Sequence, residues 1–458
     1  ARHDTMTSVE VLNESLELPC GAVMPNRLVK APMEQVLGKF LGGKPNAELL
    51  RLYHAWAAAH WGMIITGNVG VDRRYIGLMF DIVFPDPGNA AQQAEYRPAF
   101  ERWARVCKGQ AADDTGAGIP ASAGKRPLAI VQIVHCGRQS TRGAGRPPWV
   151  PAVAPSAVPM MTDGKQTWSD KLIFGTPKAL TTDEVHDVIA RFVRGAVFCA
   201  ETGFDGIELH AAHGYLLSTF LSPLTNQRTD AYGGSAENRF RIVREIIEQT
   251  RERVPASFAI GIKLNSSDYV KGGLSEEDAL QNVRWLAETH MVDFVEVSGG
   301  TYEKPAMFAE ADAPKQSASS HRREGFFASF AKRAHEVMPA GSKMRIIVTG
   351  GFRSRVGMAQ AVRDDAIDGI GLARPAALDP ALPVTVLDAQ IPDEDERTTA
   401  PTWKVPPPPA LMPNIPLVGA GWGSLWHSAQ LHRTAYGEPT APDISMLHFL
   451  RGLKVLRD

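Results

Sequence analysis

The sequence predicts an α/β protein that folds as a single (β/α)8 TIM barrel. Short β-rich apolar runs recur along its 458 residues, and segments with helical periodicity stand between them. Eight such runs can be counted over about 350 residues, which favours one closed barrel over an open sheet. No internal repeat or low-complexity array competes with this interpretation.

The strands are expected where apolar residues follow one another in short runs. These runs are Arg27–Met33, Gly62–Thr66, Leu128–Val134, Gly206–His210, Ala259–Leu264, Phe294–Val297, Arg345–Thr349 and Gly369–Leu372. The helices expected between them include Thr182–Thr202, Glu237–Arg253, Glu276–His290 and Phe326–Val337. This alternation is typical of a parallel sheet whose strands are joined by helices.

Three segments interrupt the alternation. Lys108–Arg126 is rich in Gly and Ala, and we expect an exposed insertion before the third strand. Thr141–Lys178 is a long loop after strand 3, rich in Pro and Gly, at the end of the barrel where active sites lie, so we expect it to cover a site. The tail from Asp393 begins with a Pro-rich stretch and then carries aromatic residues. We therefore expect residues 1–390 to form the barrel and residues 391–458 to form a C-terminal extension that packs on the barrel or on a partner subunit.

The charge balance disfavours a nucleic-acid binder that relies on a global positive field. Lys and Arg number 49 against 50 Asp and Glu, which gives a net charge of −1. The first ten residues lack the basic and apolar regions of a signal peptide, and no apolar run of about 18 residues could span a bilayer. We therefore expect a cytoplasmic protein with no membrane span and no nucleic-acid partner.

The cysteines give no sign of a metal or redox site. Cys20, Cys107, Cys136 and Cys199 stand far apart, and no C-x-x-C pair occurs. We expect four free thiols, mostly in the core, and no metal centre.

The richest chemistry follows the fourth predicted strand. His210 and His213 are three residues apart, and Tyr215 comes two residues later. In a barrel these side chains leave the strand at the mouth, where two imidazoles can donate to one substrate oxygen and a phenol can pass a proton. The alternatives are satisfied loop histidines with a packing tyrosine, or a zinc site that lacks an evident third ligand.

Two further groups of residues are candidates for binding. The seventh and eighth strands end in Gly350-Gly351 and Ala373-Arg374, where barrels often hold a phosphate, although a Gly-Gly pair alone is also a turn. Gln132 and Lys263 are polar residues in otherwise apolar strands. A buried lysine needs an anionic partner, which could be a carboxylate of the barrel or an electron-rich cofactor.

The stretch Phe204–Arg239 (FDGIELHAAHGYLLSTFLSPLTNQRTDAYGGSAENR) closely resembles the hallmark of the old yellow enzyme family, flavin mononucleotide (FMN) ene-reductases built on a (β/α)8 barrel. The resemblance extends to Leu18–Met33, to Gln132–Gln139 and to Ala373–Arg374, and so covers most of the chain. The long covering loop and the extended tail look most like the fungal branch of that family.

The resemblance implies a catalytic set and a cofactor site. His210 and His213 would hold the carbonyl or nitro oxygen of the substrate, and Tyr215 would protonate its α-carbon. The cofactor would be tightly bound FMN, with ten residues around it: Pro32, Met33, Glu34 and Asn68 near the ring, Gln132 at the pyrimidine edge, Lys263 near N1, and Gly350, Gly351, Ala373 and Arg374 at the phosphate.

Two of these positions depart from the family pattern. The family usually has Thr or Cys where this chain has Glu34, and Gly or Ala is common where it has Asn68. An ionised Glu34 beside the flavin would repel the anionic reduced ring, so we expect either a protonated Glu34 or a lowered flavin potential.

The function that follows is an FMN-dependent ene-reductase. It would take hydride from NADPH or NADH and reduce the activated C=C bond of an α,β-unsaturated carbonyl or nitro compound by a ping-pong mechanism. One alternative is the same flavin barrel used as an oxidase, dehydrogenase or isomerase in a biosynthetic pathway. Others are a flavin-binding barrel without turnover, and a flavin-free hydrolase, which would need paired catalytic carboxylates at strand ends. Glu208 and Glu296 lie in strands, but the sequence shows no such pairing for them. The expected partners are an electron-poor alkene and a nicotinamide nucleotide, with a homodimer as one option for the assembly.

Overall fold

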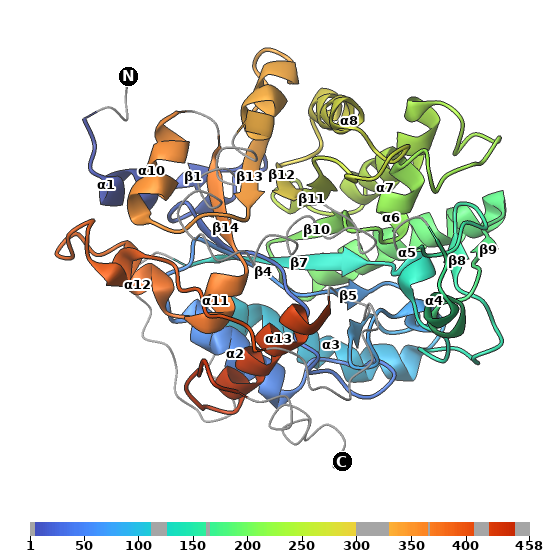
Figure 1. Cartoon of the computed structure of the whole chain (residues 1–458), viewed down its shortest axis with the longest axis horizontal. Helices are drawn as coiled ribbons and strands as arrows, with labels where there is room; N and C mark the ends of the chain where they lie inside the picture. The colour runs from blue at the N-terminus through green and yellow to red at the C-terminus, as the bar shows by residue number, and fades with distance from the viewer. Residues whose placement is uncertain are drawn as a thin grey trace.

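A closed barrel of eight parallel strands forms the centre of the molecule (Figure 1). A computed structural model of the chain describes residues 5–110, 126–161, 165–298, 329–364, 367–406 and 421–444. In order around the barrel the strands are β3 (Leu28–Lys30), β4 (Met63–Ile65), β7 (Leu128–Val134), β10 (Gly206–Ala211), β11 (Ala259–Asn265), β12 (Phe294–Ser298), β13 (Arg345–Thr349) and β14 (Gly369–Leu372). Pairing of β14 with β3 closes the ring. Each predicted run supplies one of these strands, so the predicted barrel is confirmed.

The strand register places polar residues of neighbouring strands side by side. Glu208 of β10 is level with Gln132 of β7, and His210 is level with Lys263 of β11. Lys263 is in turn level with Glu296 of β12. Because residues that alternate along a strand share one face, these side chains can meet inside the barrel.

Helices pack around the barrel, and most of them begin at a side-chain cap. The outer helices are α2 (Ala47–Ala57), α3 (Ala90–Cys107), α5 (Thr182–Glu201), α7 (Ala236–Arg251), α8 (Glu276–Thr289) and α10 (Arg355–Arg363). At the start of α5, the Thr181 hydroxyl accepts from the Glu184 N–H while the Glu184 carboxylate accepts from the Thr181 N–H. The helix predicted over Phe326–Val337 is described only over residues 329–337, which are helical.

An N-terminal segment closes the bottom of the barrel. It contains α1 (Ser8–Asn13), β1 (Leu16–Glu17) and β2 (Val23–Met24). Leu16 and Met24 pack with interior residues of six barrel strands, among them Phe294. Position 261 needs a glycine, because a Cβ there would lie 2.1 Å from Cζ of the Phe294 side chain.

Short elements line the mouth. They are β5 (Val69–Gly70), the 3-10 turn η1 (Arg73–Tyr75), β6 (Ile82–Val83), η2 (Gly137–Gln139) and α6 (Leu216–Leu221). The covering loop is partly regular: β8 (Val153–Ala154) pairs with β9 (Lys178–Ala179), and α4 (Trp168–Ile173) lies between them. Most of the predicted insertion Lys108–Arg126 lies outside the described residues.

After the last barrel strand the chain forms α11 (Arg374–Leu378), α12 (Leu382–Val386), η3 (Glu396–Thr398) and α13 (Gly421–Ala435). Helix α13, drawn red in Figure 1, packs on α2 and on α11. Leu431 and Ala435 join the main hydrophobic core, and Trp426 is fully buried.

Among the helices of the described segments, none has the combined length and apolar character needed to cross a bilayer. All four cysteines are free thiols, and three of them are buried, as predicted.

Candidate active site

The predicted trio comes together where β10 ends. His213 adopts a left-handed backbone conformation with φ of 58°, and Gly214 follows with φ of 76°, so the chain turns sharply after the strand. The ring centroid of His210 lies 5.2 Å from that of His213 and 4.5 Å from that of Tyr215. The three rings therefore form one cluster at the mouth of the barrel.

Both imidazoles are neutral at physiological pH. Burial lowers the pKa of His213 to about 3 and that of His210 well below its usual value, with Lys263 adding repulsion in both cases. Nδ1 of His210 accepts from the Ala212 N–H at 3.4 Å, which assigns the ring proton to Nε2. Nε2 of His213 lies 2.9 Å from the Ser298 hydroxyl. His210 can thus offer its Nε2–H to a ligand without carrying a charge, and His213 can offer its Nδ1–H in the tautomer whose Nε2 accepts from the Ser298 hydroxyl.

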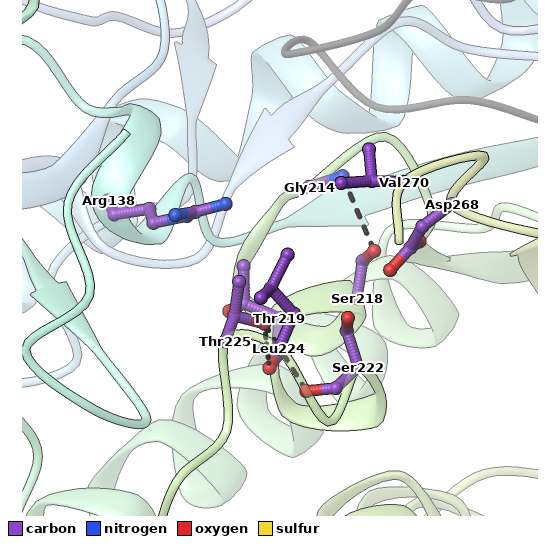
Figure 2. A pocket seen from close by; sticks show the side chains of 9 residues that line it. All are labelled: Arg138, Gly214, Ser218, Thr219, Ser222, Leu224, Thr225, Asp268 and Val270. Atoms are coloured by element: carbon purple, nitrogen blue, oxygen red, sulfur yellow. Dashed lines mark hydrogen bonds between the residues drawn. The ribbon is translucent and has the colours of Figure 1, made fainter. Parts of the chain in front are cut away.

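The turn that carries these residues is packed from behind by α6 and the loop after β11. Figure 2 shows the cavity there, with the Ser218 hydroxyl accepting from the Gly214 N–H at 3.3 Å. Its volume of about 10 Å³ is room for a single water molecule. This space therefore supports the turn and is too small to be a second ligand site.

Glu34 contacts Tyr215 directly. The Tyr215 hydroxyl and the Asn68 side-chain amide both donate to Oε1 of Glu34 at 2.7 Å, and the Asn68 amide also lies 3.2 Å from the Tyr215 oxygen. Burial raises the pKa of Glu34 against the lowering effect of these two hydrogen bonds. The sequence placed Glu34 and Asn68 near a flavin ring but did not predict their contact with Tyr215.

The segment after β3 is held in place from two sides. Pro32 and Met33 are half-buried, and Gly67 passes so close that a Cβ there would lie 2.2 Å from the Met33 carbonyl oxygen. From the other side, the Ser428 hydroxyl of α13 donates to the Glu34 carbonyl oxygen at 3.1 Å. His432 Nε2 lies 2.9 Å from the Gln35 carbonyl oxygen. The C-terminal extension therefore helps to position Glu34.

A buried polar layer lies inside the barrel below the mouth. Lys263 Nζ lies 2.7 Å from Oε1 of Glu296, and the Gln132 side-chain amide donates to Oε1 of Glu208 at 2.7 Å. The anionic partner of Lys263 in the structure is therefore a carboxylate of the barrel, which is one of the two alternatives that the sequence left open. Burial raises the pKa of Glu208 well above its usual value, and the adjacent Glu296 raises it further. Glu208 and Glu296 thus form a buried carboxyl pair that sequence reasoning did not predict.

The ends of β13 and β14 have the backbone expected of an anion site. Gly350 and Gly351 have φ of 124° and 86°, conformations that favour glycine. Ala373 and Arg374 follow β14 at the start of α11. Burial lowers the pKa of the nearby His427 to about 4, and the charges of Arg374 and Arg353 contribute. The predicted phosphate residues are therefore adjacent, and α13 brings His427 to the same positively charged region.

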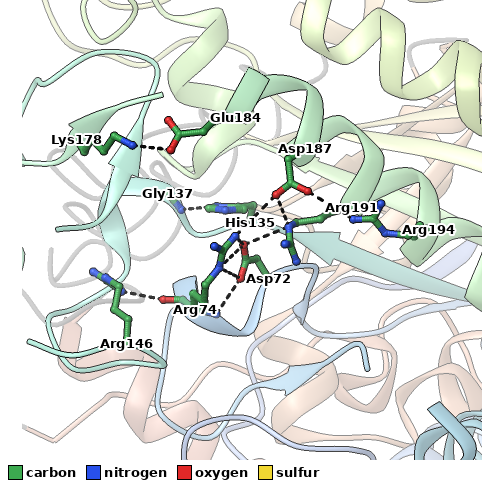
Figure 3. A network of polar contacts seen from close by, with 10 residues as sticks. All are labelled: Asp72, Arg74, His135, Gly137, Arg146, Lys178, Glu184, Asp187, Arg191 and Arg194. Carbon is green, nitrogen blue, oxygen red and sulfur yellow. Dashed lines mark hydrogen bonds and ion pairs between the residues drawn. The ribbon is translucent and has the colours of Figure 1, made fainter. Parts of the chain in front are cut away.

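A network of charged side chains joins the covering loop to α5 (Figure 3). Asp72 accepts from Nε of Arg74 at 2.9 Å and lies 3.4 Å from Nε of Arg191. Arg146 of the covering loop donates to the Arg74 carbonyl oxygen at 3.1 Å. Burial disfavours the charge of Asp72, but the hydrogen bonds from Arg74 outweigh it and bring the pKa to about 2.

Within the described residues, no three His, Cys, Asp or Glu side chains group together as metal ligands.

The family model for the NADH:flavin oxidoreductase / NADH oxidase family matches residues 124–394, more than half of the chain. The chain belongs to this family. The resemblance to old yellow enzyme is confirmed, and the protein is an NAD(P)H-dependent flavin oxidoreductase whose cofactors are FMN and a nicotinamide nucleotide.

Its relatives in this family include fungal and bacterial proteins. The chain is 37% identical over 397 residues to "NADH-dependent flavin oxidoreductase iliE" of Hypocrea jecorina, covering 85% of this chain and 92% of the relative. It is 31% identical over 366 residues to "NADH oxidase" of Thermoanaerobacter brockii, covering 79% of this chain and 48% of that protein.

Solved structures share the fold. The old yellow enzyme homologue from Zymomonas mobilis has a TM-score of 0.61 and 20% identity, with coverage of 84% of this chain and 95% of that chain. Morphinone reductase in complex with tetrahydroNAD also has a TM-score of 0.61 and 20% identity, with coverage of 85% and 97%.

The residues of this chain fit the FMN of the family. Gly350 and Gly351 adopt the positive φ angles that favour glycine, and Arg374 supplies positive charge for a phosphate. In the buried polar layer below the mouth, Lys263 supplies a cation that can offset the charge of a reduced isoalloxazine ring. The donor set is thus the one that a phosphorylated, electron-rich ligand needs.

Proposed function

We propose that this oxidoreductase is an ene-reductase that reduces the C=C bond of α,β-unsaturated carbonyl or nitro compounds. The observation that carries the proposal is the cluster of His210, His213 and Tyr215, in which the neutral His210 ring lies 5.2 Å from the His213 ring and 4.5 Å from the Tyr215 ring. When an activated alkene is reduced, negative charge develops on its oxygen and a proton is needed at its α-carbon. The cluster contains donors for both.

Each residue has a role in this scheme. His210 and His213 donate N–H hydrogen bonds to the substrate oxygen, and Tyr215 delivers the proton to the α-carbon. Bound FMN supplies the hydride for the β-carbon. With FMN bound, Lys263 and Gln132 would face its ring, Pro32 and Met33 would flank it, and Gly350, Gly351, Ala373 and Arg374 would hold its phosphate. Because nicotinamide and alkene use the same site in turn, we propose a ping-pong mechanism.

An absorption experiment tests the proposal. The purified protein is reduced anaerobically with NADPH or NADH, and 2-cyclohexenone is then added in the same cuvette. We expect flavin bands that bleach with the nucleotide and return with the enone. Bands that bleach and stay bleached would reject the ene-reductase assignment for this alkene class and leave the flavin oxidoreductase assignment in place.

The rival within the same family is an oxidase, because one relative is named NADH oxidase. Oxygen consumption with NADH and no alkene separates the two. If oxygen uptake is faster than enone reduction at the same NADH concentration, the oxidase is the better assignment.

A further inference from the structure

A groove on the outside of the barrel has no part in the site described above. Its walls come from α5, from the segment after β6, from the start of α3 and from Arg253, two residues after α7. Its volume is about 290 Å³, against about 10 Å³ for the cavity behind the catalytic turn. Because one water molecule occupies about 30 Å³ of the liquid, the groove has room for a small organic molecule.

The floor of the groove is apolar. Phe84, after β6, and Phe198, on α5, both line it, and their ring centroids lie 6.0 Å apart. Gly195 permits this close packing, because a Cβ there would lie 3.0 Å from Cε2 of the Phe84 ring. Val71 and Pro85 add to the apolar lining. A molecule with an apolar body therefore gains free energy by covering this surface.

The charged residues that line the groove are three arginines and one acid. The arginines are Arg191, Arg194 and Arg253, and the acid is Glu201. Glu201 is already paired, since its Oε2 accepts from Nη2 of Arg97 at 2.7 Å. The lining therefore presents more positive than negative charge to a molecule in the groove.

Arg191 is neutralised by two acids that do not line the groove (Figure 3). Its Nε donates to Oδ2 of Asp187 at 2.8 Å and lies 3.4 Å from Oδ2 of Asp72. Arg194 has no contact as close as these, since its Nη2 lies 3.8 Å from Oδ1 of the same Asp187. One carboxylate thus serves both arginines, and the charge of Arg194 is only partly compensated.

Arg253 has no ion-pair partner in the part of the chain that the structure describes. Burial lowers the pKa of Arg194, and the charges of Arg191 and Arg253 lower it further. The carboxylates of Asp187 and Asp86 act in the opposite direction without cancelling this effect. Like charges that face one space disfavour each other, and an anion between them removes that repulsion.

We propose that this groove binds a small organic anion, a carboxylate carried on an apolar body. The carboxylate pairs with Arg194 and Arg253, and the apolar body covers Phe84 and Phe198. A carboxylate suits these arginines because a planar guanidinium donates two parallel hydrogen bonds to its two oxygens. An apolar body is needed because an inorganic ion would leave the aromatic floor in contact with water. The proposal is independent of the ene-reductase function, since no groove residue belongs to the catalytic trio or to the FMN set.

Isothermal titration calorimetry of the FMN holoenzyme tests the proposal, with cyclohexanecarboxylate as the probe. We expect saturable binding of one molecule per chain. Two reference compounds separate the two parts of the site: cyclohexanecarboxamide has the same body without the charge, and inorganic phosphate has charge without the body. Each should bind about tenfold more weakly, or worse.

Three results of this titration would overturn the proposal. The first is the absence of saturable binding of the carboxylate. The second is equal affinity for the amide, which would show that the arginine charges play no part. The third is equal affinity for phosphate, which would show a simple ion site that ignores the apolar floor.

Two variants locate the probe in the groove. Arg253→Gln removes one charge at an exposed position and should weaken binding of the carboxylate about tenfold. Val197→Trp adds bulk to the α5 wall without changing charge and should weaken binding at least as much. Arg105→Gln is the matched control, because Arg105 is an exposed arginine of α3 that does not line the groove. Wild-type affinity in both groove variants would place the probe elsewhere and contradict the proposal.

The flavin spectrum gives a second readout of where the probe binds. Binding in the groove should leave the absorption bands of FMN unchanged, because the groove residues are separate from the residues assigned to the cofactor. A spectral shift that saturates together with the calorimetric curve would place the probe at the mouth and reject the groove as its site. Neither measurement uses an alkene, so the result stands whether or not the protein is an ene-reductase.

Discussion

At the scale of single residues, the charge state of the barrel interior depends on which of two carboxyl groups keeps its proton. Glu208 and Glu296 are both fully buried, and Glu296 forms an ion pair with Lys263 at 2.7 Å. Burial and the charge of Glu296 raise the pKa of Glu208, so Glu208 is the protonated member. The layer then holds the Lys263–Glu296 ion pair and one neutral acid, beside the buried Lys30, whose pKa burial lowers to about 7.

This assignment predicts unequal effects of two chemically identical substitutions. Glu208→Gln replaces a neutral acid with a neutral amide of the same shape, and we expect a loss of less than about 1 kcal/mol. Glu296→Gln removes the anion beside a buried lysine, and we expect a loss of about 3 kcal/mol or more. The free energy of unfolding from urea titration at pH 7 measures both. Equal losses for the two variants would mean that the charge is not on Glu296.

The residue scale also shows what the sequence could and could not predict about the site. His210, His213 and Tyr215 lie within six residues, so local spacing was enough to place them together. Glu34 and Tyr215 are 181 residues apart, and their contact depends on two loops meeting across the mouth. The pairing of Glu208 with Glu296 likewise depends on strand register and burial, which no local pattern contains.

At the scale of elements, Asp72 links the covering loop to α5. Arg146 of the loop donates to the Arg74 carbonyl oxygen, and Asp72 joins the Arg74 side chain to Arg191 of α5. Asp72 contacts Arg74 and Arg191, and its carboxyl group is only 4% exposed. The folded pKa of about 2 is lower than the ordinary value of 3.8, so Asp72 stabilises the folded state above pH 4 and loses this effect as pH falls from 3.8 to 2.

We therefore expect Asp72→Asn to lower the free energy of unfolding by about 2 kcal/mol at pH 7. The loss should be constant from pH 8 to pH 5, because Asp72 is ionised in both the folded and unfolded wild type over that range. Urea titrations at several pH values measure it. Asp395→Asn is a matched control, since Asp395 also pairs with a nearby arginine, Arg397, but at the surface. A loss that changes with pH inside this window would contradict the assignment.

Helix α13 makes a separate prediction about the mouth. His432 is 4% exposed and its Nε2 lies 2.9 Å from the Gln35 carbonyl oxygen, next to Glu34. His432→Phe leaves that carbonyl without its donor, and we expect a loss of about 1–3 kcal/mol in unfolding free energy. His432→Gln keeps an N–H donor and should recover most of it. If both variants are equally destabilised, the ring volume and not the hydrogen bond holds the segment.

The elements that the sequence predicted best are those with strong local patterns. All eight strands fall on short runs rich in apolar residues, and α5 begins at the capping box of Thr181 and Glu184. Helix α13 was not predicted, because it starts with Gly421-Trp422-Gly423 and glycine is a poor helix former. Its stability comes from burying Trp426 and Leu431 against the barrel, which is tertiary information.

At the scale of the whole molecule, acid stability is set by two opposing sets of buried groups. Five buried or half-buried histidines have lowered pKa values, mainly through burial: His135, His210, His213, His427 and His432. Below the unfolded pKa of about 6.5, the unfolded state binds protons at these sites and the folded state does not, so stability falls as pH falls. Carboxyl groups with raised pKa values act in the opposite direction, because the folded state holds their protons more tightly; they are Glu34, Asp81, Asp205, Glu208 and Asp379.

The two sets predict opposite changes in the pH dependence of stability. Between pH 6.5 and 5, His432→Gln removes one histidine and should make the decline in unfolding free energy shallower by about 1.4 kcal/mol per pH unit. Glu208→Gln removes one proton held by the folded state and should make the decline steeper by a similar amount. Urea unfolding of the holoenzyme at half-unit pH steps measures both slopes, with His186→Gln, an exposed position, as the control. His432 takes up its proton in the unfolded state, whereas Glu208 holds its proton in the folded state. If the slopes of both variants change in the same direction, burial of these groups does not control acid stability.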